Sequence, residues 1–410
     1  MAQHNSTMRD WMAVAALAVG AFIVVTTELA PIGMLSGIAD NFSQTPGRTG
    51  LVVTAYAWIG AVAALVAVLA VSGLQRRPLM VGLMLILALS NAVAAASSTF
   101  NMLLMARLFG ALAHGAFWTM VGTLGAQLVS TRQVGRATAI IFGGVSAASV
   151  IGVPLVNLIS NHGGWRVGFT CLAILSLITA LALAVLLPRI SGSEPLNRSV
   201  FKAVLSKTQL RRLYAIAAMA IVAHFAAFTF VEMLLSSRLH VSASSIAICL
   251  FAFGAAGIVG NFLCGALIDR HPKYLLGMAL LSMSLCLIVI GSGIAGGTAV
   301  ATILVFAWGM GIAMVFVSIQ TAVIRVAGNA ALPASAIYVA IFNGAIGTGA
   351  LVGAGILDGW GIGLLCTGAA ALSLISLAVV PRLQVTSAGG STPGTASSVR
   401  EAESTLERQA

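Results

Sequence analysis

Long stretches of uncharged, apolar residues recur along most of this 410-residue chain. A bilayer core about 30 Å thick is crossed by about 20 helical residues, and only helices or closed barrels satisfy every backbone polar group inside it. The stretches are too long and too continuous for barrel strands, so the pattern predicts an all-α integral membrane protein. We expect twelve spanning helices, at residues 11–35, 50–72, 79–97, 102–127, 137–160, 167–187, 213–235, 243–268, 275–294, 298–324, 334–356 and 361–380.

The composition agrees with a chain that lies almost wholly in a membrane. Apolar residues make up 59% and charged residues 8% of the chain, against about 45–50% and about 25% in soluble domains. No interval between the spans is long enough for a separate soluble domain. The first span is too long for the apolar core of a signal peptide, so we expect it to stay in the mature chain.

Lys and Arg are distributed unevenly between the predicted loops. The loops on the same side as the amino-terminus hold most of them, whereas the other loops hold only Arg48, Arg166 and Arg238. Because basic loops stay in the cytoplasm, both termini are expected to be cytoplasmic. This topology explains the net charge of +11 without a nucleic-acid partner.

A polar segment divides the series of spans after the sixth. Residues 189–212 hold six basic residues and one acid, so we expect a basic cytoplasmic linker between two six-helix halves, residues 1–188 and 213–383. Within the linker, apolar and basic residues between 201 and 207 fit either a short amphipathic helix on the anionic inner leaflet or a solvated connection. Residues 384–410, rich in Ser, Thr, Gly and Ala, are expected to form a disordered cytoplasmic tail.

The two halves share features at an offset of roughly 200 residues. "TTELAPIGM" and "TFVEMLLSS" each carry one acid, Glu28 and Glu232. "SGLQRRPLMVGL" and "GALIDRHPKYLLGM" each place basic residues and a Pro before the next span. The fifth and eleventh spans have small residues at every fourth position, which lets helices pack closely in lipid. Together these matches indicate an internal duplication.

Two six-helix halves with basic 2–3 and 8–9 loops resemble the major facilitator superfamily over the whole chain except the tail. "RLFGALAHGAF", which contains Arg107, and "GVSAASVIGVPLV" resemble its drug:proton antiporter branch. The chain is most similar to bacterial SotB-type sugar efflux transporters, through the ordered series "AFIVVTTELAPIGMLSGIA", "YAWIGA", "RLFGALAHGAFW", "IGVPL", "GWR", "AHFAAFTFVE" and "FNGAIGTGALVG". The resemblance implies two pseudo-symmetric bundles, a place in the bacterial inner membrane, and proton-coupled sugar export by alternating access.

The resemblance also implies a conformational role for residues of the 2–3 loop, the 8–9 loop and the fifth span. These residues are Arg76, Arg77, Gly152, Pro154, Asp269 and Arg270. The chain departs from the family pattern at two of these places. Gln75 stands where the general motif has an acid, so the gating salt bridge is expected to be one-sided, and Val153 separates the Gly and the Pro that the antiporter signature joins directly.

One acid, Glu28, lies in an otherwise apolar span. A charge inside the membrane is costly, so an ionisable residue there is a functional candidate by default. Glu28 and Arg107 lie at similar distances from the outer ends of spans that run in opposite directions, so the two can meet at one depth. His114 lies two turns after Arg107, and His224 and Glu232 lie nearly on one face of span seven. We expect these five residues to line one central cavity and to couple transport to protons.

Each of these residues also has a purely structural interpretation. Glu28 would form a permanent ion pair with Arg107 that only fixes two helices, and Glu232 would lie in water near the outer surface. The functional roles open to His114 and His224 are to relay protons or to bond a sugar hydroxyl, and the structural alternative is that they merely join helices. The sequence leaves these alternatives open.

The solute site is expected near the membrane midplane, between the halves. Side chains able to stack on a sugar ring or to bond its hydroxyls are Tyr56, Trp58, Phe117, Trp118, Asn261, Gln320 and Asn343. Ordinary packing in the core or at the interface is the alternative role for each.

We therefore expect a monomeric transporter whose partners are protons, a small solute, with sugar favoured, and the lipid bilayer. An exporter of drugs or other amphipathic compounds is the nearest rival. The sequence has no metal-ligand cluster, no nucleophile with a positioned base and no signalling domain, so we expect neither an enzyme nor a sensor, and no cofactor. A P-loop is absent too, so nucleotide hydrolysis is not expected to drive transport.

Overall fold

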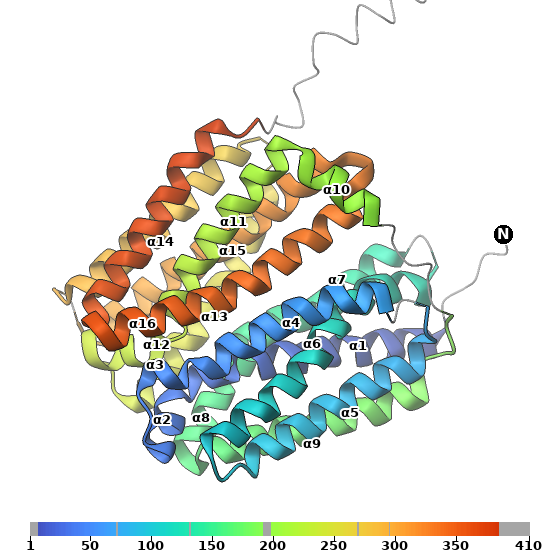
Figure 1. Ribbon diagram of the computed structural model, residues 1–410, viewed down its shortest axis with the longest axis horizontal. Coiled ribbons are helices and arrows are strands. Elements are labelled where there is room, and N and C mark those ends of the chain that lie inside the picture. The colour runs from blue at the N-terminus through green and yellow to red at the C-terminus, as the bar shows by residue number, and fades with distance from the viewer. Residues whose placement is uncertain are drawn as a thin grey trace, which may run out of the picture.

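A computed structural model of the protein describes residues 7–70, 73–130, 133–191, 198–268, 270–294 and 296–384. Within these ranges the chain forms helices and no strands, and eleven helices are long and apolar enough to cross a membrane (Figure 1). The last of them, α16 (Ala331–Val379), is bent at Gly361, where φ is +82°. It thus supplies the last two predicted spans, and the predicted all-α membrane fold is confirmed.

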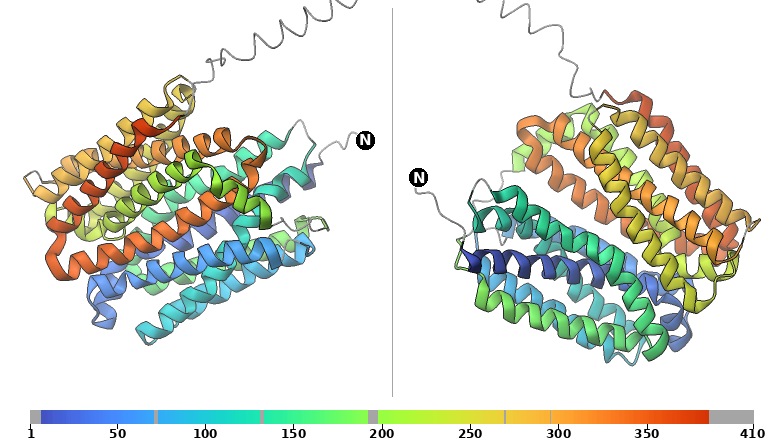
Figure 2. Two further views of the ribbon diagram at one scale, coloured as in Figure 1. Left: turned by 45° about the horizontal axis from the view of Figure 1, so that its top comes forward. Right: turned by 180° about the vertical axis from the view of Figure 1, so that it is seen from behind.

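The helices pack as two bundles that lie side by side (Figures 1 and 2). The first bundle contains α1 (Met8–Leu29), α2 (Leu35–Phe42), α3 (Pro46–Thr49), α4 (Leu51–Ala70), α5 (Arg76–Ala95), α6 (Phe100–Leu128), α7 (Val134–Ala147), α8 (Val153–Gly163) and α9 (Trp165–Leu186). The second contains α11 (Thr208–Phe228), α12 (Val231–Met233), α13 (Ala243–Leu267), α14 (Pro272–Ser292), α15 (Thr298–Ala327) and α16. Between them in sequence is α10 (Arg198–Ser206).

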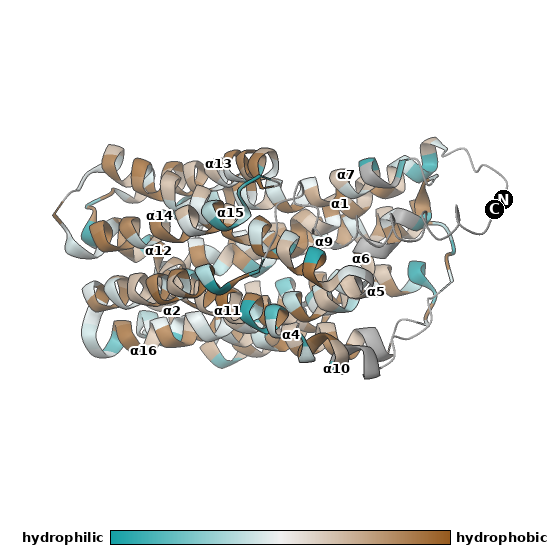
Figure 3. Ribbon diagram, turned by 90° about the horizontal axis from the view of Figure 1, so that it is seen from above, coloured by the Kyte–Doolittle hydropathy of each residue, from teal (hydrophilic) through white to brown (hydrophobic). Residues whose placement is uncertain are grey.

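The two ends of the molecule are distinguished by their short elements. The start of α1 and helix α10 lie at one end, here called the linker end, and α2, α3 and α12 lie at the opposite end, here called the distal end (Figure 1). Apolar residues run along the helices between the two ends (Figure 3). Phe109, Phe262 and Ile303 are 61%, 78% and 69% exposed, which suits a surface that faces lipid rather than water.

Local sequence signals explain where several helices begin and bend. Thr7 and Asp10 form a capping box at the start of α1, because each side chain accepts from the other residue's backbone N–H. Thr99 caps α6 in the same manner, by accepting from the N–H of Met102. Gly164 and Gly361 turn the chain at equivalent places in the two halves, with φ of +83° and +82°, a conformation that costs Gly nothing.

The first and seventh predicted spans are interrupted rather than continuous. Span 11–35 is divided after Leu29 by a 3-10 turn, Ala30–Gly33, because Pro31 has no backbone N–H to continue the helix. Span 213–235 is divided after Phe228, and α12 is followed by a π-helix, Leu234–Arg238. Glu28 lies just before the first break and Glu232 just after the second, so each acid lies beside irregular backbone.

The fifth span is divided as well. A π-helical segment, Ala148–Gly152, joins α7 to α8, and Pro154 lies in the first turn of α8. A Cβ on Gly144 would overlap the carbonyl of Ala18, and one on Gly152 would overlap the side chain of Thr26. The small residues therefore let this span lie directly against α1, the close approach that small-residue stripes permit in membranes.

Two seams join the bundles. In the α4–α16 seam, Trp58 Nε1 donates to Gly344 O (3.2 Å) and to Thr348 Oγ1 (3.3 Å). In the α8–α13 seam, which includes the π-helical segment, a Cβ on Gly254 would overlap the backbone at Ser149. The bundles meet along these seams and diverge toward the linker end (Figures 1 and 2).

The described part of the linker contains the helix α10, whereas residues 189–191 are not helical. Val204 of α10 is buried in the core of the second bundle, and Lys207 Nζ donates to Ala327 O at 3.3 Å. This part of the linker therefore packs on the second bundle and is not simply solvated. Residues 192–197 of the linker and 385–410 of the predicted tail lie outside the described residues.

Candidate functional site

Arg107 of α6 is fully buried against the break in α1. Its Nη1 donates to Thr27 O (2.8 Å) and its Nη2 to Glu28 O (3.2 Å). In an unbroken helix Thr27 O would accept from the residue four positions on, but that residue is Pro31, which has no N–H. Arg107 replaces the missing donor, and its positive charge suits the carboxyl end of a helix.

The same guanidinium is held from its other side by an aromatic ring. Arg107 Cζ lies 3.9 Å from the ring centroid of Tyr56 on α4, close enough for a cation–π contact. The structure thus brings Glu28 and Arg107 together, but through the main-chain carbonyls of α1. The purely structural alternative, an ion pair between the two side chains, is not what the hydrogen bonds of Arg107 show.

The carboxylate of Glu28 instead faces His114, which lies two turns after Arg107 on α6. The Glu28 Oε2 and His114 Nε2 atoms are 3.7 Å apart, and both side chains are nearly fully buried. The other carboxylate oxygen, Oε1, is buried without a hydrogen-bond partner. A buried polar atom without a partner is costly, so this oxygen is available to a proton, a water molecule or a solute.

His114 also connects the first bundle to the second. Its imidazole interacts with the side chain of Asn343 on α16, and its ring packs against Tyr56, with 5.3 Å between the centroids. Asn343 is itself buried, and its Nδ2 donates to Val339 O at 3.0 Å. Its side-chain oxygen, Oδ1, is therefore left to accept from other partners. We call Glu28, Arg107, His114, Tyr56 and Asn343 the central cluster.

His224 lies in a different environment. It is 3% exposed on α11 and packs among the rings of Phe225, Phe228, Phe253 and Trp308, at centroid distances of 4.8–6.0 Å. The described contacts of His224 are thus with the core of the second bundle and not with the central cluster. The expectation that all five ionisable residues line one cavity is wrong for His224, because aromatic packing encloses its imidazole.

Glu232 lies at the distal end and connects the bundles there. Its Oε2 accepts from the backbone N–H of Ser36, in the first turn of α2, at 3.3 Å. It is therefore neither part of the central cluster nor free in water. Burial raises the pKa of Glu232, as does nearby Asp40, whereas hydrogen bonds from Ser36 and Leu35 oppose the shift.

A second acid, Asp358 of α16, makes a parallel contact that the sequence did not reveal. Its Oδ2 accepts from Thr45 Oγ1 (2.8 Å) and its Oδ1 from the backbone N–H of Gly47 (3.2 Å). In the α8–α13 seam, Asn161 Nδ2 donates to Ala243 O at 3.3 Å. We call the cross-bundle contacts of Glu232, Asp358 and Asn161 the distal latch.

Lower pH is expected to favour the closed distal latch. Burial in the closed arrangement raises the pKa of Glu232, so this arrangement binds the proton more tightly than an open one in which the carboxyl is solvated. The charged groups near Glu232 are Asp40 and, across a cavity, Arg166. Spin labels at His162→Cys and Ser236→Cys, on exposed distal positions of the two bundles, would report the latch distance, and Glu232→Gln should reduce its pH dependence.

The predicted solute-contacting residues divide into two groups. Tyr56 and Asn343 belong to the central cluster, and Trp118 lies beside it, with its ring 6.3 Å from that of His114. Phe117 is fully buried, next to Trp118 and Gly20.

The remaining three lie elsewhere. Trp58 donates its indole N–H across the α4–α16 seam. Gln320 donates to Ser335 Oγ (3.1 Å) inside the second bundle. Asn261 is exposed on α13, seven positions after Gly254 and so on the helix face that meets the first bundle, and its place in the solute site stays a prediction.

The residues expected to control conformation lie mostly at the linker end. Arg76 is 2% exposed, its Nη1 lies 2.6 Å from Met120 Sδ and its backbone N–H donates to Ile190 O. Arg77 Nη2 donates to Ala184 O, so both residues tie the start of α5 to the end of the first bundle. Arg270 lies in an exposed turn, and Asp269 is outside the described residues.

Comparisons with known proteins place these features in a family context. The family model described as Major Facilitator Superfamily matches residues 17–333. Among solved structures, the chain is similar to a bacterial homolog of the human lysosomal transporter Spinster in an inward-facing and occupied conformation. The two share 17% identity with a TM-score of 0.73, over 95% of this chain and 100% of that chain.

Two further solved structures are similar. The inward-facing and unoccupied form of the same bacterial homolog has a TM-score of 0.66 at 17% identity, over 93% of this chain and 95% of that chain. The human organic anion transporter MFSD10 (TETRAN) has a TM-score of 0.66 at 19% identity, over 91% of this chain and 99% of that chain. At these identities the likeness is one of fold.

Proposed function

The chain belongs to the major facilitator superfamily of membrane transporters, and we propose that it exports sugars by proton antiport from the bacterial cytoplasm. One observation carries the proton-coupling part of this proposal. Glu28 is a buried acid whose Oε1 has no partner, beside a histidine that interacts with the opposite bundle. The sequence motifs that resemble sugar exporters support the choice of solute.

We assign the linker end to the cytoplasm and the distal end to the outside, because basic loops gather at the linker end. With this orientation, the described arrangement has its outer side held by the distal latch. Export then requires the latch to open while the bundles close at the linker end, the alternating access that two halves around a fixed site permit.

Proton coupling would follow from the contacts of the central cluster. Arg107 is held by the carbonyls of α1, so it stays in place while the Glu28 carboxyl gains or loses a proton. When the bundles move, the contact of His114 with Asn343 changes, and the free energy of the proton on Glu28 changes with it. The protonated and deprotonated states of Glu28 are thereby linked to the two arrangements of the bundles.

The proton gradient is large enough for such export. A proton that moves through 100 mV releases about 2.3 kcal/mol, and one pH unit adds about 1.4 kcal/mol. One proton per solute would therefore sustain a several-hundred-fold outward gradient, at about 1.4 kcal/mol per factor of ten.

Everted membrane vesicles with an acidic interior test this proposal. Labelled sugars are expected to accumulate inside, to release protons as they enter, and to leave when an uncoupler collapses the gradient. The rival is an exporter of amphipathic compounds, favoured by the aromatic side chains Tyr56, Phe117 and Trp118 around the central cluster. Accumulation of cationic drugs but of no sugar would support the rival.

Asn343→Ala is expected to lower gradient-driven accumulation about tenfold, the cost of about one hydrogen bond, because His114 would lose its polar contact with the second bundle. Solute binding to the purified protein should change less than accumulation does. Asn101→Ala is the matched control, since Asn101 is exposed at the start of α6, and it should transport normally. Equal transport by both variants would remove Asn343 from the coupling.

A further inference from the structure

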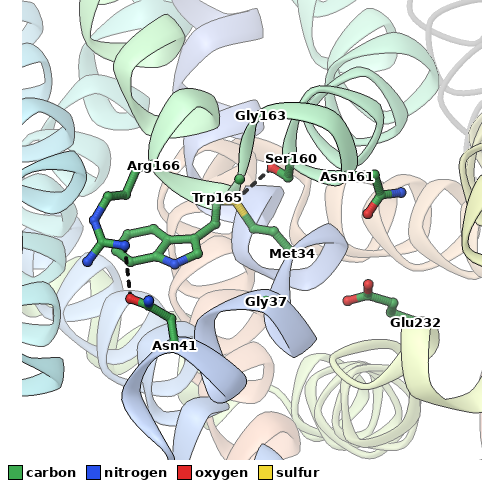
Figure 4. A pocket seen from close by; sticks show the side chains of 10 residues that line it. Met34, Gly37, Asn41, Ser160, Asn161, Gly163, Trp165, Arg166 and Glu232 are labelled. Atoms are coloured by element: carbon green, nitrogen blue, oxygen red, sulfur yellow. Dashed lines mark hydrogen bonds between the residues drawn. The ribbon is translucent and has the colours of Figure 1, made fainter.

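A cavity of about 270 Å³ lies at the distal end, between α2, the turn that joins α8 to α9, and Glu232 (Figure 4). Its lining includes Asn41, Asn161, Trp165, Arg166 and Glu232. Sites for drug-sized ligands measure about 300–1,000 Å³, so this cavity suits one small molecule. It lies apart from the central cluster, and apart from Glu232 and Asn161 its polar residues have no part in the distal latch.

Trp165 lies in the wall of this cavity and carries an unsatisfied donor. Its side chain is 4% exposed, and its indole N–H is buried without a hydrogen-bond partner. The indole nitrogen is turned toward the α2 segment of the cavity wall, between Gly37 and Asn41 (Figure 4). A buried N–H of this kind costs free energy until an acceptor engages it, so a ligand oxygen that reached it after a small shift of the cavity wall would be favoured.

The ring of Trp165 is not available as a stacking platform. Arg166 Cζ lies 4.3 Å from its centroid, and the rings of Phe42 and Phe169 lie 5.5 and 6.0 Å away. A sugar that stacks on an aromatic face would therefore find that face already covered. The indole offers its N–H edge alone.

The same side of the cavity carries further donors. Arg166 Nη1 donates to Asn41 Oδ1 and Arg166 Nη2 donates to Ser97 O, both at 2.9 Å. These two bonds fix the guanidinium and use two of its five N–H groups. Because the oxygen of Asn41 accepts from Arg166, its amide NH2 is the group left for a ligand.

The opposite side carries acceptors. Asn161 donates through Nδ2 to Asn157 Oδ1 and to Ala243 O, both at 3.3 Å, so its oxygen is the group left for a ligand. Beside it, the Glu232 carboxylate accepts from Ser36 and Leu35, and its two oxygens can accept up to about four hydrogen bonds. Figure 4 shows Arg166, Trp165 and Asn41 on one side and Asn161 and Glu232 on the other.

We propose that this cavity binds a small α-amino acid as a zwitterion. The carboxylate would lie toward Arg166 and the Trp165 N–H, and the ammonium group toward Glu232. A neutral sugar would not exploit this separation of charge, because each of its hydroxyls is both donor and acceptor.

Occupation of the cavity would also act on the distal latch. Arg166 and Trp165 belong to the first bundle and Glu232 to the second, so a bound zwitterion bridges the two. A ligand that binds one arrangement and not the other stabilises that arrangement. An amino acid in this site therefore holds the distal end closed, whatever solute the central cluster transports.

The test measures, by calorimetry, the binding of L-alanine to the purified full-length protein in lipid nanodiscs. Two analogues, each of which lacks one of the two charges, are measured in the same way. N-acetyl-L-alanine lacks the ammonium group and L-alaninamide lacks the carboxylate. L-alanine is expected to bind and both analogues to bind at least about tenfold more weakly, since each loses a charge-assisted contact. Equal binding of an analogue, or no binding of L-alanine, would overturn the proposal.

Variants locate the site. Glu232→Gln and Arg166→Gln are each expected to weaken L-alanine binding about 10- to 100-fold, and Trp165→Phe to weaken it by a smaller factor. Arg212→Gln, a charge loss at the linker end, is the control and should leave binding unchanged. If Arg166→Gln does not fold, Arg166→Lys and Glu232→Gln suffice, because an affinity that both leave unchanged excludes this cavity.

A readout of the latch completes the test. With spin labels at His162→Cys and Ser236→Cys, L-alanine is expected to increase the fraction of molecules in which the distance between the labels is short, as in the closed latch. No transport is measured, so the result is independent of the sugar-export proposal. D-glucose that binds here with the same loss in Arg166→Gln would contradict the assignment to a zwitterion.

Discussion

Glu28→Gln is expected to abolish gradient-driven accumulation of solute while solute binding survives. The amide keeps the volume of the side chain and can still approach His114, but it cannot exchange a proton, so the gradient has nothing to act on. The main-chain carbonyls that hold Arg107 are unchanged by this substitution. Accumulation by everted vesicles, and binding to the purified protein, measure the two properties separately.

Glu232→Gln is the matched control, because it removes the lone acid of the seventh span. Glu232 contacts Ser36 at the distal end, so this variant should still couple solute movement to protons and should differ mainly in the latch. Downhill exchange of labelled solute by Glu28→Gln would show that the bundles still move. Full uphill accumulation by that variant would exclude Glu28 from the coupling, and loss of the protein from the membrane would favour a structural role.

The spans of this protein were predictable because lipid imposes a simple rule on the chain. Each crossing needs about 20 apolar residues, and that requirement is visible without knowledge of any contact. The breaks next to Glu28 and Glu232 were less visible. Pro31 is a sign of the first, but the span was predicted as continuous because apolar residues extend on both sides of it.

The central cluster was predictable only in part. The spacing of Arg107 and His114 on one helix placed them on one face, and the opposite directions of the spans placed Glu28 at a similar depth. The hydrogen bonds from Arg107 to main-chain carbonyls of α1 were not predicted. They depend on the backbone N–H that Pro31 lacks and not on the identity of any side chain in α1. Sequence spacing describes side chains, whereas this contact is made to the backbone.

The distal latch could not be derived from the sequence. Asp358 lies near the end of a span, where a single acid is ordinary, and its partners Thr45 and Gly47 lie in the other half of the chain. Pairing across the two bundles is a property of their arrangement. His224 was misplaced for the same reason, since its enclosing rings come from three helices, α11, α13 and α15.

Gly254→Val is expected to stop transport by forcing the bundles apart. A Cβ on Gly254 would overlap Ser149 O and Val150 Cα in the backbone of the π-helical segment, and backbone cannot rotate away as a flexible side chain does. Overpacking of this kind typically costs about 1–3 kcal/mol. The described arrangement should therefore lose roughly 5- to 150-fold in population relative to one with the α8–α13 seam open.

Gly265→Val on the same helix is the matched control, because a Cβ there meets no other atom within 4 Å. The two variants lose the same helix-breaking residue and gain the same β-branched one, so any difference between them comes from the seam. Labels at His162→Cys and Ser236→Cys, with the five native cysteines replaced, should show a longer distance in Gly254→Val alone. If both variants transport alike, close approach of backbones at this seam is not required for export, and the α4–α16 seam and the distal latch would have to hold the bundles together.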